Sequence, residues 1–282
     1  MISPRGTDYL EKGTALMRLM TWNINSLRLR LPLLEKLTCD EQPDVICLQE
    51  TKVPDPLFPV EQLQEMGWKY YVYWGMKGYN GVAILSRYPL EAVQNAPDWC
   101  GRGDSRYVAA WVQLPTGRVL VHNFYVPAGG DVPDPNENDK FAHKLAFLEE
   151  ARAFFAKDTF KSSILVGDLN IAPREHDVWS HKQLLKIVSH TPIEVKALNA
   201  WQDTGFVDAM RHLIPEPEKL YTWWSYRNRD WKKSNRGRRL DHIWVSPDLL
   251  AGVKACRVLK DVRDWEGPSD HVPVMMDLEV IA

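Results

Sequence analysis

The sequence lacks any apolar run long enough to cross a membrane, and its N-terminal residues contain no apolar stretch that would mark a secretory signal. Its four cysteines show no paired spacing, which favours reduced thiols in a cytoplasmic protein over a disulfide framework. There is also no internal repeat and no low-complexity linker. We therefore expect a cytoplasmic globular protein that has no membrane partner.

Motifs for several common chemistries are absent as well. The chain has no Gly-x-Ser-x-Gly elbow and no Gly-Lys-Ser/Thr phosphate loop. His176 and His181 are five residues apart, which does not place both on one helix face, and no cysteine lies nearby to complete a zinc site. Covalent catalysis therefore has no obvious nucleophile.

The size and composition fit a single catalytic domain. With 282 residues and 45% apolar side chains, the chain can bury a large core as one domain or as two tightly packed halves. Residues 1–16 are polar and charged. We expect a flexible N-terminal extension over residues 1–16 and a single domain over residues 17–282.

Predicted strands outnumber predicted helices. Apolar runs bounded by polar residues predict strands at 18–24, 44–49, 70–74, 80–86, 107–113, 117–125, 163–168, 239–245 and 272–280. Helices are predicted at 31–41, 194–201 and 141–156, the last with Phe141, Leu145, Leu148 and Phe154 near one face. Few intervals permit a regular βαβ repeat. This pattern favours an α/β fold of two packed mixed sheets flanked by helices over a doubly wound parallel sheet.

Carboxylate, amide or imidazole groups stand at the ends of several predicted strands. A carboxylate at the end of a buried strand is costly unless it is paired, protonated or bound to a metal. The economical interpretation is one site where these strand ends converge on a divalent cation and a phosphate. The segments concerned are 20–25, 45–52, 164–170, 239–245 and 269–271.

Asp168 and Asn170 are the first candidates for catalysis. They are two residues apart, so both side chains project to the same side of an extended strand end. A carboxylate beside a carboxamide can orient an attacking water and take its proton. The alternative is an ordinary Gly-Asp-x-Asn turn. The presence of four other polar strand ends in the sequence favours a catalytic role instead.

A magnesium site is expected beside them. Mg²⁺ prefers a few carboxylate oxygens with water retained, and it would neutralise charge on the phosphate and on the departing alkoxide. Glu50 is the preferred ligand, with Asn23 and Asp270 as further ligands directly or through water. Asn25 is a weaker candidate, because it can simply satisfy the turn after its strand. We expect Mn²⁺ to substitute for Mg²⁺.

His271 directly follows Asp270 at a strand start. A single histidine is usually structural, but one beside several acids is a candidate phosphate ligand. A carboxylate partner would raise its pKa and fix its tautomer.

One basic segment contrasts with the net charge of −2. Residues 227–239 contain seven Lys or Arg residues, including Lys232 and Lys233, against the single acid Asp230. Trp223, Trp224, Tyr226 and Trp231 lie within or just before this segment. Cations and flat rings are what a groove needs to hold phosphates and to stack bases or a sugar. The alternative is a solvated charged loop, which would leave four aromatic side chains exposed without purpose.

At these residues the chain resembles the exonuclease III family of apurinic/apyrimidinic (AP) endonucleases, within the wider DNase I-like phosphodiesterase superfamily. The resemblance runs from about Met17 to the C-terminus and rests on motifs in a fixed order. They are Trp22-Asn23-Ile24-Asn25-Ser26-Leu27-Arg28, Leu48-Gln49-Glu50-Thr51-Lys52, Gly81-Val82-Ala83-Ile84-Leu85-Ser86, Gly167-Asp168-Leu169-Asn170-Ile171-Ala172-Pro173 and Ser269-Asp270-His271.

The resemblance implies a four-layered α/β sandwich and a Mg²⁺-dependent phosphodiesterase of DNA base-excision repair. Such an enzyme cleaves the backbone 5′ to abasic sites and leaves a 3′-OH, and it has 3′-5′ exonuclease and 3′-end-cleaning activities. The implied partner is double-stranded DNA with abasic sites or blocked 3′ ends, and we expect a monomer that reaches the nucleoid through DNA.

The resemblance also suggests roles for individual residues. Asp241 is the acid that the family pairs with His271, and Tyr125 matches the phosphate-side tyrosine, although it can also be a strand tyrosine with an exposed hydroxyl. Trp223 and Leu240 match the walls of a slot for an extrahelical abasic sugar, although Trp223 can also be plain core. Arg238 replaces a large apolar residue of some relatives, so it can hold a phosphate or narrow the slot.

Two other classes of function compete with this interpretation. Loss of a candidate catalytic residue would indicate a non-catalytic DNA- or protein-binding module, and none is lost. A lipid or inositol phosphodiesterase would want an exposed apolar hairpin or a polyphosphate pocket, and neither is evident in the sequence.

Overall fold

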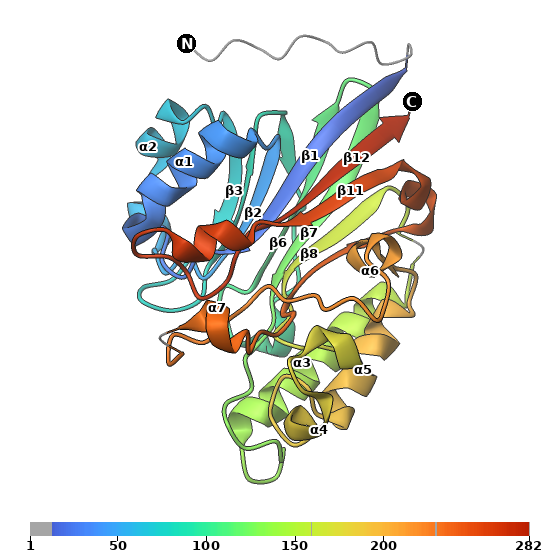
Figure 1. Ribbon diagram of the computed structural model, residues 1–282. Coiled ribbons are helices and arrows are strands. Elements are labelled where there is room, and N and C mark those ends of the chain that lie inside the picture. Colours follow the sequence, from blue (N-terminus) through green and yellow to red (C-terminus); the bar gives the residue numbers. More distant parts are fainter. Residues whose placement is uncertain (1–12, 159, 229, 282) are drawn as a thin grey trace.

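The computed structural model describes residues 13–158, 160–228 and 230–281. Over these residues the chain forms two six-stranded mixed sheets that pack face to face (Figure 1). The first has the order β11-β12-β1-β2-β4-β3, with strands β1 (Thr14–Asn23), β2 (Val45–Gln49), β3 (Tyr70–Trp74), β4 (Val82–Ser86), β11 (Val253–Val258) and β12 (Val274–Ile281). The second has the order β5-β6-β7-β8-β10-β9, with β5 (Leu90–Ala92), β6 (Tyr107–Leu114), β7 (Gly117–Tyr125), β8 (Ser163–Asp168), β9 (Val207–Asp208) and β10 (Asp241–Val245).

Helices cover the outer faces of both sheets. One apolar cluster packs α1 (Leu31–Glu41) and α2 (Val60–Glu65) on the first sheet, and another packs α3 (Asp139–Phe155) and α5 (Pro192–Gln202) on the second. A third cluster fills the space between the sheets. The short helices are α4 (His181–Leu184), α6 (Ala209–Leu213) and α7 (Trp231–Ser234). The predicted α/β sandwich of two mixed sheets is confirmed.

The central strands each contain a continuous apolar run because both of their faces are covered. All residues of β2, β4, β8 and β10 are buried. Such strands appear in the sequence as continuous runs without alternation. None of the described helices is long and apolar enough to span a bilayer.

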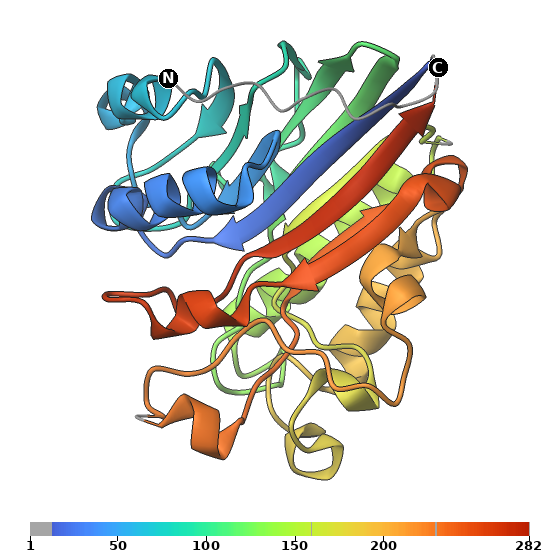
Figure 2. The same cartoon turned by 45° about the horizontal axis from the view of Figure 1, so that its top comes forward.

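The first sheet begins earlier than the sequence suggested. In β1, Thr14 pairs with Ile281 and Leu16 pairs with Glu279 of β12. Residues 14–16 therefore belong to the sheet and not to the expected extension, while residues 1–12 lie outside the described part of the chain. The two strands run side by side in Figures 1 and 2.

The buried face of α3 differs from the predicted one. Phe141 and Leu148 are buried as expected, but Leu145 and Phe154 are only partly buried. The buried stripe instead includes Lys144, at the spacing that a helix needs between Phe141 and Leu148. The sequence pattern predicted the wrong face because Lys144 is charged, and a lysine is almost never fully buried without a partner.

Candidate active site

The candidate residues meet at one edge of the two sheets because of the strand register. Asn23 ends β1 and pairs with Gln49, the residue before Glu50. In the second sheet, Asp168 at the end of β8 lies between Tyr125 of β7 and Asp241 of β10. These strand ends converge in the lower middle of Figure 1.

Asn23 joins the two sheets at this edge. Its fully buried side-chain Nδ2 donates to Glu50 Oε1 at 2.9 Å and to Asp168 Oδ2 at 2.8 Å. One amide therefore fixes two carboxylates from different sheets.

Glu50 is held as an anion. Tyr125 donates its hydroxyl to Glu50 Oε1 at 2.8 Å, and Lys52 Nζ lies 2.8 Å from Oε2. Burial raises the pKa of Glu50, but the hydrogen bonds from Asn23 and Lys52 and the charge of Lys52 outweigh it, so the pKa is lower than usual. The site therefore contains a permanent negative charge near neutral pH.

Three candidate residues have left-handed backbone conformations. Asn25, Glu50 and Asn170 have φ values of 48°, 51° and 54°. Such angles are uncommon outside glycine and carry strain, most clearly for a glutamate. They turn the chain sharply just after a strand and aim these side chains toward the shared edge.

Asp168 is a buried carboxylate with a fixed orientation. Its Oδ1 accepts from the Asn170 backbone N–H at 3.0 Å, and Asn170 Nδ2 donates to the carbonyl of Val126 at 2.9 Å. Burial raises the pKa of Asp168; His271 counteracts this effect, whereas the charges of Asp241 and Glu50 add to it. A carboxylate with a raised pKa is a better proton acceptor near neutral pH.

His271 is held as a cation on the other side. Its Nδ1 donates to Asp241 Oδ2 at 2.9 Å, and Thr222 Oγ1 donates to the same oxygen at 2.6 Å. Burial alone would lower the pKa of His271, but the charges of Asp241 and Asp168 and the hydrogen bond to Asp241 raise it to about 10. Its Nε2 lies 3.6 Å from Asp168 Oδ2. A cationic donor and a buried carboxylate thus face each other.

The remaining candidates surround this pair. Asn25 Nδ2 donates to Asp270 Oδ1 at 3.1 Å, and its Oδ1 accepts from Lys52 Nζ at 2.6 Å. Trp223 Nε1 donates to Asp270 Oδ2 at 2.9 Å. Asn25 is therefore more than a turn residue, because it links Lys52 to Asp270.

Trp223, Leu240 and Arg238 lie together next to His271. Backbone bridges pair Trp223 with both Arg238 and His271. Leu240 is buried in a small apolar cluster against which Trp223 packs. The Arg238 guanidinium lies 5.3 Å from the centre of the Trp223 ring.

Residues 20–271 match the Endonuclease/Exonuclease/phosphatase family. The chain belongs to this family. Exodeoxyribonuclease III of Haemophilus influenzae is 31% identical over 272 residues, which cover 93% of this chain and 100% of the relative. The 3′ phosphatase NExo from Neisseria, solved with a product DNA hairpin, has a TM-score of 0.85 at 34% identity and covers 93% of this chain and 99% of its own. An AP endonuclease from Archaeoglobus fulgidus has a TM-score of 0.84 at 30% identity, with 94% and 99% covered.

As a member of the Endonuclease/Exonuclease/phosphatase family, the protein is a nuclease, that is, a phosphodiester hydrolase. The predicted family resemblance and the predicted enzyme class are confirmed. The roles of individual residues are not decided by these similarities, so they are argued below from the geometry.

The family consists of metal-dependent nucleases. Two groups of residues in this chain have oxygen or nitrogen atoms that could bind a metal ion. The ligand atoms of Asp168, Asp241 and His271 lie within 4.8 Å of one another. His271, however, holds protons on its ring nitrogens while it pairs with Asp241. Glu50 offers an ionised carboxylate, a hard oxygen ligand that fits Mg²⁺ better. The Oδ1 of Asn23 accepts from the Asn25 backbone N–H at 3.1 Å, while its Nδ2 faces Glu50.

Only some of the cations in residues 227–239 are exposed, whereas the sequence suggested that the whole segment could face DNA. Lys232 and Lys233 are exposed, and Lys232 Nζ lies 2.7 Å from Asp264. Arg239 is fully buried and pairs with Asp177 and Asp208, so it is not available to DNA. Among the described cations of this segment, Arg227 and Arg236 are also exposed; Arg229 lies outside the described residues.

The aromatic side chains of this segment also divide. Trp224 is buried and packs on Trp231, Trp223 and Trp231 are partly buried, and Tyr226 is exposed. The argument that a solvated charged loop would leave all four rings exposed therefore does not hold, because Trp224 is buried in the fold itself. Trp224 is not available to stack on DNA.

Four residues of the site have no predicted role. Lys52 contacts Glu50, and Thr222 contacts Asp241. The Arg106 guanidinium lies 4.9 Å from the centre of the Tyr125 ring. Lys144 contacts the Asn170 backbone. Lys52 stands two residues after Glu50 in the same motif, and Lys144 interrupts an apolar helix face. Those two signals were present in the sequence.

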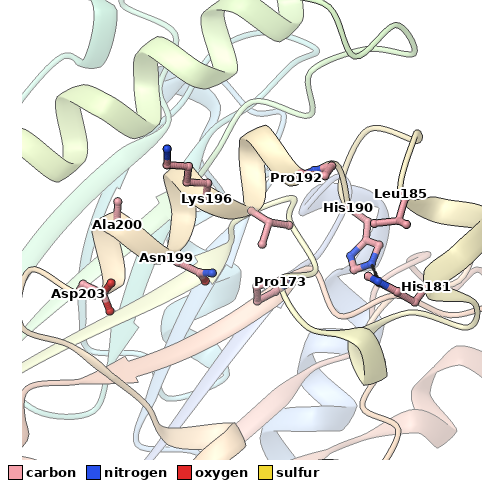
Figure 3. A pocket seen from close by; sticks show the side chains of 10 residues that line it. Pro173, His181, Leu185, His190, Pro192, Lys196, Asn199, Ala200 and Asp203 are labelled. Atoms are coloured by element: carbon pink, nitrogen blue, oxygen red, sulfur yellow. Dashed lines mark hydrogen bonds between the residues drawn. The ribbon is translucent and has the colours of Figure 1, made fainter.

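A cavity of about 560 Å³ opens between α4 and α5 (Figure 3). It is lined mainly by apolar groups such as Pro173 and Pro192, together with the hydrogen-bonded pair His181 and His190. None of the predicted site residues lines it. The cavity is therefore separate from the candidate active site.

Proposed function

We propose that this enzyme is a Mg²⁺-dependent nuclease of DNA base-excision repair. It cleaves duplex DNA 5′ to abasic sites to leave a 3′-OH, and it trims nucleotides and blocking groups from 3′ ends. We also propose that the chain forms a single catalytic domain. This domain begins at Thr14, earlier than the expected residue 17, because Thr14 already pairs with β12. The monomer is the functional unit, and the unpaired thiols of its cysteines suit the reducing cytoplasm.

The observation that carries the proposal is the opposition of Asp168 and His271. Their facing atoms are 3.6 Å apart, and each side chain is anchored by separate partners. Phosphodiester hydrolysis needs a proton acceptor for water and a positive donor for the phosphate oxygens. This pair supplies both at the edge where the two sheets meet.

The reaction follows from these positions. Asp168, oriented by Asn23 and by the Asn170 backbone, takes a proton from the attacking water, whose oxygen bonds to phosphorus as the bond from phosphorus to the 3′ oxygen breaks. The departing 3′ oxygen takes a proton from solvent and leaves as the 3′-OH. His271, kept protonated by Asp241, donates from Nε2 to a non-bridging phosphate oxygen. The Tyr125 hydroxyl, 2.8 Å from Glu50, would face the phosphate at the same edge.

Glu50 and Asn23 would hold Mg²⁺, with Asp270 as a further ligand through water. When bound, this ion neutralises charge on the phosphate and on the departing alkoxide. Mn²⁺ has similar ligand preferences and should replace it.

We infer that the substrate preference is set by a slot beside His271. Trp223 and Leu240 provide apolar walls for a deoxyribose that has no base to hydrogen-bond. Arg238 is fixed beside Trp223 by hydrogen bonds, which its Nη1 donates to the carbonyl of Val188 at 3.1 Å and to Ser189 Oγ at 2.7 Å. We therefore infer that Arg238 narrows the slot and shifts the balance toward trimming of 3′ ends.

The direct test is cleavage of one duplex that carries a single abasic site, in the presence and absence of Mg²⁺. We expect incision 5′ to the site with a 3′-OH product, identified by extension with a polymerase. Incision on the 3′ side, or an equal rate on undamaged duplex under all conditions, would contradict the proposal.

Trp223→Ala should separate the two activities. If the ring packs against an extrahelical abasic sugar, its removal costs about 1–3 kcal/mol of binding, judged from base stacking. Abasic-site incision should therefore fall more than removal of a small 3′-phosphate, because Asp168 and His271 remain in place. Rates of both reactions on matched duplexes measure the ratio.

Three further variants complete this comparison. Trp223→Phe keeps an aromatic but smaller ring and removes the hydrogen bond to Asp270. Trp231→Ala removes a nearby ring that packs on Trp224 instead. Arg238→Leu should raise incision relative to 3′ trimming. Equal losses of both activities in Trp223→Ala would mean that Trp223 only supports the fold.

DNA affinity should fall steeply with salt despite the net charge of −2. Replacing Lys232 and Lys233 with alanine should flatten the log–log salt dependence by about 0.9 for each phosphate that these lysines neutralise. Fluorescence anisotropy with a labelled duplex at several salt concentrations measures the slope.

Lys254→Ala is the matched control, because Lys254 is also an exposed lysine with a carboxylate partner, Glu279, but it lies toward the opposite end of the first sheet. An unaltered slope in the double variant would place residues 232 and 233 away from DNA.

A further inference from the structure

A buried ion pair lies against residues 170–172, the loop that follows Asp168. Lys144 Nζ of α3 is 2.6 Å from Glu194 Oε2 of α5, and both side chains have 0% exposure. Two charges buried so completely are costly to desolvate, and an apolar pair of similar size is often as stable. Stability alone therefore does not explain why this pair is ionic.

Lys144 reaches the backbone of Asn170. Its Nζ donates to the Asn170 carbonyl at 2.9 Å and to the Ala128 carbonyl at 3.3 Å, in addition to its contact with Glu194. The three donors of the ammonium group thus have three acceptors. Because Asn170 has a left-handed backbone, its carbonyl points to a place that a regular strand would not reach.

Glu194 holds the other side of the same loop. Its Oε1 accepts from Ser189 N at 2.8 Å and from Thr191 N at 2.9 Å. The Ser189 carbonyl in turn accepts from Ala172 N at 2.7 Å. The ion pair therefore restrains residues 170–172 from both ends, immediately after Asp168.

Lys144 has little freedom to move. A Cβ added to Gly129, which has φ +90°, would lie 2.9 Å from Lys144 Cδ and 3.1 Å from Val188. The chain at residue 129 packs directly against the lysine stem, and only glycine fits there.

We propose that Lys144 and Glu194 are positioning residues for hydrolysis, and that they act through Asn170 on the orientation of Asp168. The inference rests on the proposed function, in which Asp168 accepts the proton of water. A misplacement of about 1 Å can cost on the order of 10²-fold in rate, so a restraint of this kind matters.

The test replaces the pair with Lys144→Met/Glu194→Gln, which has similar volume and no charge. The introduced glutamine can still accept from the backbone N–H groups of residues 189 and 191. We expect a melting temperature near that of the wild type, unchanged affinity for the duplex, and a single-turnover rate constant lower by on the order of 10-fold. The control Arg152→Met/Glu149→Gln removes an exposed ion pair from the same helix and should leave the rate unchanged.

Two comparisons separate positioning from support of the fold. In an Asp168→Asn background the double change should add little further loss, because it acts through the orientation of the Asp168 carboxylate; a purely structural role would add its full effect. If the double variant does not fold, Glu194→Gln alone is assayed in the same way, and a wild-type rate constant would overturn the proposal.

A wild-type rate constant in the folded double variant would also overturn it. Asp168→Asn is measured in parallel. Full activity of Asp168→Asn would refute the proposed function itself, whereas loss in Asp168→Asn with no loss in the double variant would refute only the positioning role.

Discussion

Asp168→Asn should lower the single-turnover rate of duplex cleavage by on the order of 10²-fold or more, with little change in DNA affinity. Asparagine keeps the shape of the side chain but cannot accept a proton from water. His271→Ala should cause a loss of similar size, because the positive donor that faces the phosphate disappears. Quenched-flow cleavage at saturating enzyme gives the rates, and anisotropy gives the affinities.

The exposed His212 provides a control for the histidine variant, since His212→Ala should leave both quantities unchanged. Asp241→Asn should resemble His271→Ala, because the carboxylate that holds the imidazole at 2.9 Å loses its charge. If Asp168→Asn or His271→Ala weakened binding but left turnover intact, these residues would be ground-state contacts.

Removal of divalent cations should abolish cleavage altogether, and added Mg²⁺ or Mn²⁺ should restore it. Without a cation, the carboxylates of Glu50, Asp168 and Asp270 would repel the phosphate of the substrate. Cleavage of the abasic duplex is measured in excess chelator and then during titration with each metal. Full activity in excess chelator would refute the site as drawn.

Single substitutions then locate the ion. Glu50→Gln should raise the Mg²⁺ concentration for half-maximal activity by about 10-fold or more, whereas Glu61→Gln, on the exposed start of α2, should not. A shift in Asp241→Asn but not in Glu50→Gln would place the ion between Asp168, Asp241 and His271 instead.

The sequence predicted the strands that are covered on both faces, because their apolar runs are continuous. It missed β5, β9 and β11, which all lie at the edges of their sheets. An edge strand pairs with a neighbour on one side only and its side chains are less buried, so its residues are more mixed; β11 is largely half-buried or exposed. The early start of β1 was missed for a related reason, since residues 14–16 gain their structure from pairing with β12.

Convergence of the candidate site was also predictable, because polar side chains stood at the ends of buried strands. The partners of charged residues were not. Arg239 looked like a DNA-binding cation, and only the fold brings Asp177 and Asp208 against it. Lys144 interrupts an apolar helix face in the sequence, but only the packing of α3 on α5 supplies its partner Glu194. Burial of charge depends on neighbours that are distant in the chain.

The pairing of the first and last strands has a consequence for how the enzyme is made. Asn23 lies near the start of the chain, and His271 enters the site just before β12, which closes the first sheet against β1. A ribosome must therefore release almost the whole chain before its two ends can meet. A nascent or prematurely terminated product lacks His271, so under the proposed mechanism we expect it to be unable to cleave DNA.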